Sequence, residues 1–222
     1  MDDAQGNGAR GFDTVVFDLG NVLLDWEPRY LYRGMFDSEE EMETFLSEAA
    51  ILDWHHEQDR GRTIAEGTEL LTARHPEYAR EIEAFYERWD EMFDGEIPGT
   101  VDILRELRER GYTVHALTNY SAETFPLARR RYEFLGWFGE IVVSGEEGMV
   151  KPDREIYDLL VERAGIEPAT SVFVDDKAEN IRAAEEIGFT GIIFRNAGEL
   201  RERMSRLGIL AESAGRTDGR EL

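Results

Sequence analysis

Cysteine is absent from this chain of 222 residues, and lysine is nearly absent, with Lys151 and Lys177 as its two examples. Without cysteine there is no disulfide framework, no thiolate nucleophile and no cysteine-held metal. No apolar run is long enough to cross a bilayer, and residues 1–10 are polar, without the apolar core of a signal peptide. These absences predict a soluble, cytoplasmic protein that does not enter a membrane.

Basic residues are also scarce: the chain has 25 Lys and Arg against 48 Asp and Glu, which gives a formal net charge of −23. Such a charge argues against a nucleic-acid partner or an anionic membrane surface. It also suggests a saline habitat, since screening by salt would relieve the self-repulsion of an acidic surface. The hydrophobic fraction of 41% is ample for one large core, or for a domain that carries an insertion.

The order of apolar segments predicts an α/β fold. A first strand is expected at residues 14–17, and from Pro98 onward strands near 114–117, 141–143, 171–174 and 191–194 alternate with helical segments. Repeated strand–helix units imply right-handed crossovers and a parallel sheet covered by helices on both faces. We therefore expect a Rossmann-like α/β domain.

A helical insertion is expected after the first strand. Pro28 suits a first helical turn, Ser38 and Glu41 have the spacing of a capping box, and segments 63–74 and 77–93 have helical periodicity. Residues 54–56 (Trp-His-His) are expected between helices, with the histidines in packing rather than on a metal. We assign residues 12–24 and 97–211 to the core, 25–96 to the insertion, and 1–11 and 212–222 to disordered ends.

Reactive side chains follow the predicted strands. Asp18, the pair Thr118–Asn119 and the pair Asp175–Asp176 each follow a strand, and Lys151 begins a predicted helix. In a parallel sheet these ends meet at one edge, where ligands bind. Carboxylates from two strands can share Mg²⁺, while hydroxyl, amide and ammonium groups hold phosphoryl oxygens. Each residue alone also suits an ordinary turn; together they predict a metal-assisted phosphoryl site.

Four motifs resemble those of the haloacid dehalogenase (HAD) superfamily. They are Phe-Asp-Leu-Gly-Asn-Val-Leu at 17–23, Leu-Thr-Asn at 117–119, Ser-Gly-Glu-Glu-Gly-Met-Val-Lys-Pro-Asp at 144–153, and Val-Asp-Asp-Lys-Ala-Glu-Asn at 174–180. The resemblance extends from residue 12 to 207, and the insertion is similar to the α-helical cap of one subgroup. It implies that Asp18 attacks phosphorus and becomes an aspartyl-phosphate, and that Asp18, Asp176 and the carbonyl of Gly20 hold Mg²⁺.

The resemblance also implies roles for the remaining motif residues. Thr118 and Asn119 would bind phosphoryl oxygens, and Lys151 would neutralise charge between the nucleophile and the phosphate. Asp175 and Asn180 would orient Lys151 and the waters on the metal. The implied activity is a magnesium-dependent phosphatase that acts on a small phosphorylated metabolite, with neither nucleic acid nor membrane as partner, as a monomer or a homodimer.

Gly20 departs from the family pattern. Most phosphatases of the superfamily have a second aspartate at this position, as general acid and base, so proton transfer here lacks an evident side chain. The variant motif is nevertheless similar to that of bacterial sugar-phosphate phosphatases of the α-D-glucose-1-phosphate phosphatase type, as is the segment 54–61. Asp25 and a residue of the cap, such as His55, are the candidates for the missing acid.

Two other functions stay open at this point. A 2-haloacid dehalogenase also uses an aspartate nucleophile and also lacks the second aspartate, although such enzymes have neutral residues where this chain has Asp175 and Asp176. A catalytically weak protein that only binds phosphorylated ligands is the second. The substrate is not named by the sequence, and the candidates for specificity are in or near the insertion: Trp26, Arg29, Trp54, His55, His56 and Arg60.

Overall fold

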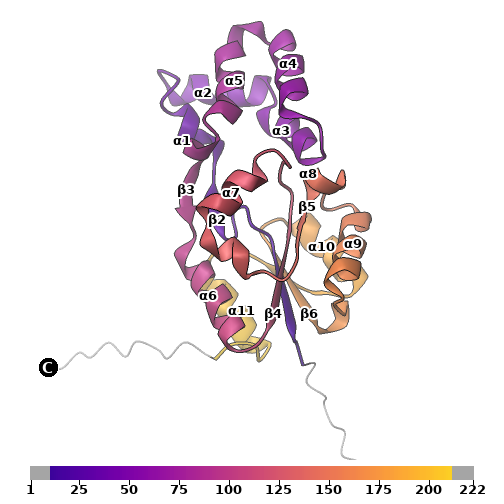
Figure 1. Cartoon of the computed structure of the whole chain (residues 1–222). Helices are drawn as coiled ribbons and strands as arrows, with labels where there is room; N and C mark the ends of the chain where they lie inside the picture. Colours follow the sequence, from indigo (N-terminus) through magenta and orange to yellow (C-terminus); the bar gives the residue numbers. More distant parts are fainter. Residues whose placement is uncertain (1–10, 212–222) are drawn as a thin grey trace, which may run out of the picture.

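The computed structural model describes residues 11–211, so the predicted disorder at 1–10 and 212–222 lies outside the described residues. Its centre is a parallel sheet of five strands in the order β5-β4-β1-β6-β7 (Figure 1). The strands are β1 (Thr14–Phe17), β4 (Thr113–Thr118), β5 (Ile141–Val143), β6 (Ser171–Asp175) and β7 (Thr190–Ile193). The central strand β1 pairs with β4 on one side and β6 on the other.

Both faces of the sheet are covered. Val15 and Phe17 of β1 belong to one apolar cluster and Val16 to another, as expected for a strand whose side chains alternate between two buried faces. The first cluster includes residues of α6 (Pro98–Glu109) and α11 (Ala197–Arg206), and the second includes residues of α9 (Arg154–Ala164) and α10 (Ala178–Ile187). The prediction of a Rossmann-like α/β sheet is confirmed.

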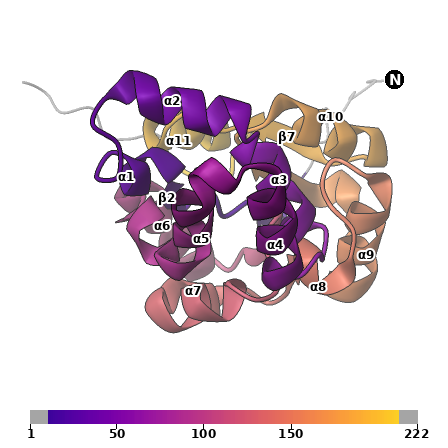
Figure 2. The ribbon, with the colours of Figure 1, turned by 90° about the horizontal axis from the view of Figure 1, so that it is seen from above.

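A group of helices, which we call the cap helices, stands over the carboxyl edge of the sheet (Figures 1 and 2). They are α1 (Pro28–Tyr32), α2 (Glu39–Glu48), α3 (Ile51–Asp59), α4 (Ile64–Arg74) and α5 (Ala79–Glu87). Their starts follow from the sequence, since Ser38 Oγ accepts from the Glu41 N–H and Thr63 Oγ1 from the Glu66 N–H, each at 3.2 Å. The short elements η1 (Pro76–Tyr78), η2 (Trp89–Met92), α7 (Phe125–Arg131), η3 (Glu133–Trp137), α8 (Ser144–Glu147) and η4 (Pro168–Thr170) complete the chain.

Several local predictions were wrong. Residues 54–56 lie inside α3 rather than between helices, and the helix expected over 77–93 is divided into η1, α5 and η2. The helix expected to begin at Lys151 begins at Arg154. An antiparallel pair, β2 (Leu24–Trp26) and β3 (Phe93–Glu96), was not predicted, because these strands are short and their residues are mostly half-buried or exposed. The pair lies at both borders of the insertion, and the division at 24/25 and 96/97 stays a proposal.

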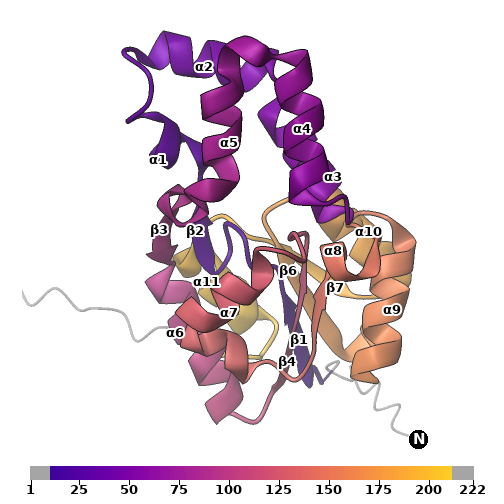
Figure 3. The same cartoon turned by 45° about the horizontal axis from the view of Figure 1, so that its top comes forward.

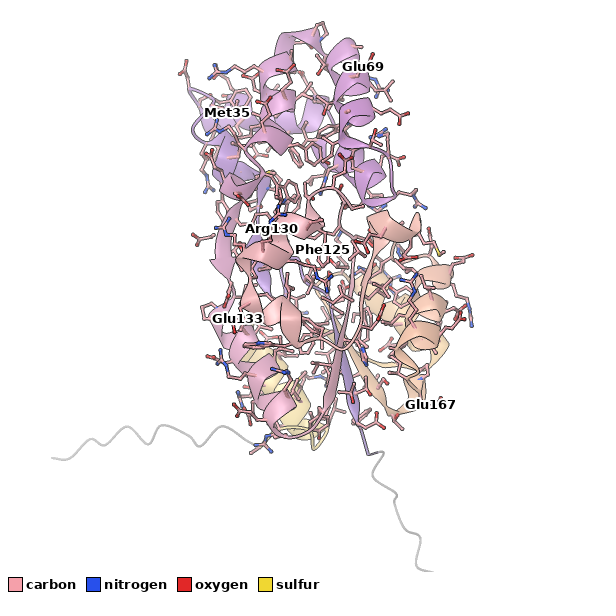
Figure 4. All side chains as sticks on the ribbon, viewed as in Figure 1. Met35, Glu69, Phe125, Arg130, Glu133 and Glu167 are labelled. Atoms are coloured by element: carbon pink, nitrogen blue, oxygen red, sulfur yellow. The ribbon has the colours of Figure 1, made fainter. Side chains whose placement is uncertain are left out.

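Acidic side chains are spread over the outside of the molecule. Glu69 on α4, Glu133 in η3 and Glu167 before η4 are exposed and lie far from one another (Figure 4). Exposed acidic residues are therefore found in separate parts of the described chain. Within residues 11–211, the longest helices are too short and too polar to span a membrane.

Candidate active site

The ends of three neighbouring strands bring the predicted residues together. Asp18 follows β1 directly, and its N–H donates to the carbonyl of Val174 in β6 at 2.8 Å, so the two strands stay paired up to the acid. Asp175 ends β6 and Thr118 ends β4. Thr118 is 1% exposed and Asp18 is 8% exposed, so the edge that carries them is shielded from bulk water.

A tight turn follows Asp18. The Leu19 carbonyl accepts the N–H groups of Leu23 and Leu24, each at 2.9 Å, and Asn21 adopts a left-handed conformation with φ of 56°. Asparagine tolerates this conformation better than most residues, which explains why it follows Gly20. Gly20 lines the cavity above the sheet edge, and a Cβ at this position would have no neighbour within 4 Å.

Lys151 is buried between two carboxylates. Its Nζ lies 2.9 Å from Oδ1 of Asp18 and 2.7 Å from Oδ2 of Asp175, and its side chain is 1% exposed. Burial alone would lower the pKa of this ammonium, but Asp175 and Asp18 outweigh burial and raise it, so Lys151 is charged. Asn180 Nδ2 donates to both oxygens of Asp175, at 2.9 and 3.0 Å, and the Lys177 N–H donates to Oδ1 at 2.8 Å.

Asn119 holds the main chain at Lys151. Its Nδ2 donates to the Lys151 carbonyl at 3.0 Å, and its Oδ1 accepts from the Lys151 N–H at 2.8 Å. Both amide atoms are therefore used to position the loop that carries the lysine. The sequence led us to expect contacts from Asn119 to phosphoryl oxygens; any such contact would have to come from its main-chain N–H, since the side chain is engaged.

A third carboxylate completes an acidic cluster. Oxygens of Asp18, Asp175 and Asp176 lie within 4.8 Å of one another. The pKa of Asp18 is raised to about 7, because burial and the charges of Asp175 and Asp176 together outweigh the lowering effect of Lys151. Burial and the charge of Asp175 also raise the pKa of Asp176. A divalent cation would relieve this repulsion, and all-oxygen donors suit Mg²⁺. Because the oxygens of Asp175 already accept several hydrogen bonds, Asp18 and Asp176 are the carboxylates that fit a magnesium ion.

A cavity of about 470 Å³ separates this edge from the cap helices. Both lysines of the chain line it, together with Asp18, Gly20 and Asp176. Its volume is that of a site for a small ligand. Part of the cavity side formed by the insertion is aromatic, because Trp26 and Trp89, with ring centroids 6.1 Å apart, line it together with Phe93.

Four of the six predicted specificity residues line this cavity: Trp26, Arg29, His55 and His56. The other two do not. Trp54 is buried among the cap helices and donates from Nε1 to the Gly67 carbonyl at 2.7 Å. Arg60 instead forms an ion pair with Asp153, at 2.9 Å.

A family model for haloacid dehalogenase-like hydrolases matches residues 12–188, which is most of the chain. The chain belongs to this hydrolase family. The resemblance predicted from the four motifs is thereby confirmed. The match covers the cap helices and all the residues of the acidic cluster.

Relatives and solved structures agree with this membership. The hydrolase is 28% identical over 182 residues to the sesquiterpene phosphatase of Aspergillus oryzae, a match that covers 82% of this chain and 89% of the relative. A HAD family enzyme from Bacteroides thetaiotaomicron, solved with magnesium and inorganic phosphate, matches with a TM-score of 0.63 and 24% identity over 84% of this chain and 96% of that one.

The L-2-haloacid dehalogenase of Xanthobacter autotrophicus matches with a TM-score of 0.60 and 18% identity, over 81% of this chain and 76% of the dehalogenase. The two solved structures share the fold with this hydrolase. Because one is a magnesium and phosphate complex and the other a dehalogenase, the fold by itself does not separate phosphate from halide chemistry.

The end of α3 is docked on the core of the hydrolase, where α3 contacts α8 (Figure 3). Ser144 Oγ donates to the Asp59 carbonyl at 2.6 Å and accepts from the Tyr120 N–H at 2.9 Å. Nearby, the Ile64 N–H donates to Glu123 at 2.7 Å. These contacts hold the last turn of α3 beside the carboxyl edge of the sheet, where Asp18 lies.

Asp59 is among the lining residues of the hydrolase that the sequence reasoning missed. Asp59 ends α3 and lines the cavity, with Oδ2 at 3.7 Å from Nε2 of His55. The signal was available, because His55 and Asp59 are four residues apart and would share one face of a helix. Placing this segment between helices concealed that relation.

Proposed function

We propose that the protein is a magnesium-dependent phosphatase that hydrolyses a small phosphate monoester through an aspartyl-phosphate on Asp18. The observation that carries the proposal is the buried Lys151 between Asp18 and Asp175, with Asp176 as a third carboxylate close by. A cation held by Asp18 and Asp176 would supply positive charge to the phosphoryl oxygens. The family membership and the phosphatase among the relatives support this activity.

The chain's own residues prepare Asp18 for attack. Oδ1 of Asp18 accepts the Leu19 N–H at 2.7 Å and lies 2.9 Å from Nζ of Lys151, so the carboxylate is fixed in orientation. A bond forms between Asp18 and phosphorus while the bond from phosphorus to the leaving oxygen breaks. Water then attacks phosphorus, releases phosphate and restores Asp18. Lys151 stays charged throughout and offsets the negative charge of the transferred group.

Thr118 and the main-chain N–H of Asn119 are proposed to bind the phosphoryl oxygens, since both residues lie at the end of β4 next to Asp18 in the sheet. The Gly20 carbonyl is proposed as a further magnesium ligand. Asp175 and Asn180 are proposed to position Lys151, because Asn180 Nδ2 donates to both oxygens of Asp175 and Lys151 Nζ donates to Oδ2 of Asp175.

The rival reaction is dehalogenation of a 2-haloacid. Halide needs no proton to leave, and attack on carbon needs no metal. Three close carboxylates beside one lysine leave negative charge in excess, which disfavours an anionic haloacid unless a cation is bound. The acidic pair Asp175–Asp176 therefore favours phosphoryl transfer.

Two substrate classes suit the cavity. A sugar phosphate agrees with the motif resemblance, and a ring could stack on Trp26 or Trp89. A prenyl phosphate suits the same aromatic wall and the name of the Aspergillus relative. We place the sugar phosphates first, and a magnesium-supplemented screen over phosphorylated sugars, prenyl alcohols, nucleotides and small acids would rank them. Neither a nucleic acid nor a membrane is proposed as a partner, and monomer and homodimer both stay predictions.

The decisive assay compares two substrates. We expect p-nitrophenyl phosphate to be hydrolysed with Mg²⁺ and not in EDTA, and 2-chloropropionate to release no chloride in either condition. Chloride release in EDTA, with the phosphate ester untouched, would identify a dehalogenase. Binding of inorganic phosphate with Mg²⁺, but no turnover of any phosphate ester in the screen, would identify a binding protein.

A further inference from the structure

Hydrolysis of an ordinary phosphate ester leaves an alkoxide that needs a proton. Gly20 has no side chain to give one, at the position where the family resemblance implies an acid. General acid help is typically worth about 10²- to 10⁴-fold in rate, so a phosphatase without any donor would be slow. The identity of this proton donor matters only if the proposed phosphatase function is right, so the inference rests on that function.

The two donors suggested by the sequence are poorly suited. Asp25 does not line the cavity, and its Oδ1 accepts the hydroxyl of Tyr30 at 3.1 Å. His55 does line the cavity, but burial, together with the positive charge near it, lowers its pKa to about 3. His55 is therefore neutral at physiological pH and is a weak acid in that form.

Asp59 has the geometry that these two lack. It lines the same cavity as Asp18 and Lys151, but from the cap side, and it is 6% exposed. Its Oδ1 has no hydrogen-bond partner among the described residues, and its Oδ2 is 3.7 Å from Nε2 of His55, too far for a hydrogen bond. A buried carboxylate oxygen that lacks a donor, as Oδ1 does, is costly, whereas a protonated carboxyl group can stay there and offer its proton to a ligand.

We propose that Asp59 is the general acid and base of this phosphatase, in place of the residue absent at Gly20. As the bond from phosphorus to the leaving oxygen breaks, Asp59 gives its proton to that oxygen, and the alcohol departs. The Asp59 carboxylate then takes a proton from the water that attacks the aspartyl-phosphate. Phosphate leaves, Asp18 is regenerated and Asp59 is protonated again, so the cycle consumes one ester and one water.

The surroundings of Asp59 keep it protonated before the reaction. Burial raises its pKa to about 8. The neighbouring groups have opposite effects on the Asp59 pKa. The charges of Lys177 and Lys151 lower it, as does the main-chain N–H of Ser121, whereas the charge of Asp18 raises it. The other titratable neighbours, on α3, on α5 and after β4, are uncharged near neutral pH: His55, Tyr86 and Tyr120.

The docking of α3 keeps Asp59 in reach of the leaving group. The main-chain carbonyl of Asp59 accepts a hydrogen bond from the hydroxyl of Ser144 at 2.6 Å, and Ser144 follows β5 at the carboxyl edge of the sheet. Because this contact uses the main chain, it does not depend on the carboxyl group. Substitution of the side chain therefore leaves the anchor of the helix in place.

The test compares Asp59→Asn with Glu57→Gln, which makes the same acid-to-amide change at an exposed position of the same helix that does not line the cavity. The substrates are an alkyl ester, such as glucose 6-phosphate, and p-nitrophenyl phosphate, whose leaving group needs no proton. We expect Asp59→Asn to lower single-turnover cleavage of the alkyl ester by about 10²- to 10⁴-fold and that of p-nitrophenyl phosphate by less than about tenfold.

A second readout follows the return of the proton. Because Asp59→Asn lacks the base for the water step, p-nitrophenolate should appear in a burst of nearly one per active site, followed by slow turnover with phosphate bound to Asp18. Glu57→Gln should show neither effect. Equal losses on both substrates, or unchanged cleavage of the alkyl ester, would overturn the assignment of Asp59.

Failure of this inference can be told apart from failure of the proposed function. If the unmodified protein does not hydrolyse p-nitrophenyl phosphate with Mg²⁺, the phosphatase itself is wrong. If it does, and Asp59→Asn cleaves both substrates normally, only the role of Asp59 is wrong. Asp59→Glu serves as the folding control, since a retained carboxyl group should restore part of the alkyl-ester activity that the amide lacks.

Discussion

The active-site cavity has a core wall, formed by the strand ends, and a cap wall, formed by the lining residues of the insertion. The carboxyl groups of these two walls have different surroundings. On the core side, Asp175 accepts four side-chain or main-chain donations, and Lys151 neutralises it. On the cap side, Oδ1 of Asp59 has no partner among the described residues, and its nearest ring nitrogen belongs to a neutral histidine. One wall holds its acid with an ammonium group and several donors, whereas the other leaves one oxygen of its acid without a donor.

This difference matches the two ends of a phosphate ester. The phosphoryl end carries negative charge and needs fixed cations and a nucleophile, which the strand ends provide. The leaving group needs a proton, which a buried carboxyl group with a raised pKa provides. The core can thus serve any phosphate ester, while the cap side combines the proton donor with the aromatic wall that meets the organic part of the substrate.

The largest expected effect comes from the core wall. Asp18→Asn should lower kcat/KM for p-nitrophenyl phosphate by about 10⁴-fold or more, because removal of a nucleophile removes the covalent route. The measurement is phosphate release with Mg²⁺ under steady-state conditions. Asp25→Asn, outside the cavity, is the matched control and should stay within about twofold of the unmodified protein. Unchanged turnover in Asp18→Asn would remove Asp18 from the mechanism.

The second prediction uses the two lysines of the chain. Lys151→Met should destabilise the metal-free protein by about 3 to 5 kcal/mol, since it leaves two buried carboxylates without their counter-charge. Lys177→Met changes an exposed lysine beside the same cavity and should cost within about 0.5 kcal/mol. Urea unfolding in EDTA measures both. Equal costs for the two variants would show that the buried ammonium does not hold this wall together.

The core wall could be predicted from the sequence, whereas the cap wall could be predicted only in part: four of its residues were expected there, and Asp59 was not. Asp18, Thr118 and Asp175 follow apolar runs, and parallel strands carry such ends to one edge, so their meeting needed no knowledge of packing. The spacing of His55 and Asp59 could have placed both on one face of a helix, but the position of Asp59 at the cavity depends on the docking of α3 on Ser144. That docking depends on contacts between distant segments, which local periodicity does not contain.

The short strands β2 and β3 escaped prediction for a related reason. Their few residues alternate only weakly between buried and exposed, and their pairing joins residues about 70 positions apart. The role of the Asn119 side chain could not be predicted either, because it depends on a distant segment. Its presence at a strand end was evident, but its use as a clamp on the Lys151 main chain depends on where the 151 loop lies.

The third prediction moves the acid from one wall to the other. A Cβ at Gly20 has open space around it, so Gly20→Asp should be accommodated without a clash. In the Asp59→Asn background it should restore alkyl-ester cleavage by about tenfold or more, which is the lower part of the range for general acid help. Gly20→Asn in the same background is the control and should restore nothing. Equal rescue by Asn would show that the gain is not proton transfer.

The smallest expected effect concerns stability rather than rate. The Asp59 pKa is about 8 in the folded protein and about 3.8 as an unperturbed side chain, so between these values the folded state binds the proton more tightly. The unfolded state then carries fewer protons, and the free energy of unfolding contributed by this group falls as pH rises from about 4 to about 8. Asparagine does not titrate. The stability of Asp59→Asn relative to the unmodified protein should therefore increase over this range.

His55 acts in the opposite direction, since its pKa is lowered to about 3 and its contribution to stability rises with pH up to its unperturbed value near 6.5. Because the histidine is present in both proteins, most of its effect cancels in the comparison. Urea unfolding in EDTA should show the relative stability of Asp59→Asn growing by at least about 1 kcal/mol from pH 5 to pH 8. Glu57→Gln, exposed on the same helix, should give a difference that does not change with pH. A flat difference for Asp59→Asn as well would mean that the carboxyl group is already ionised in the folded protein, and the cap wall would then resemble the core wall.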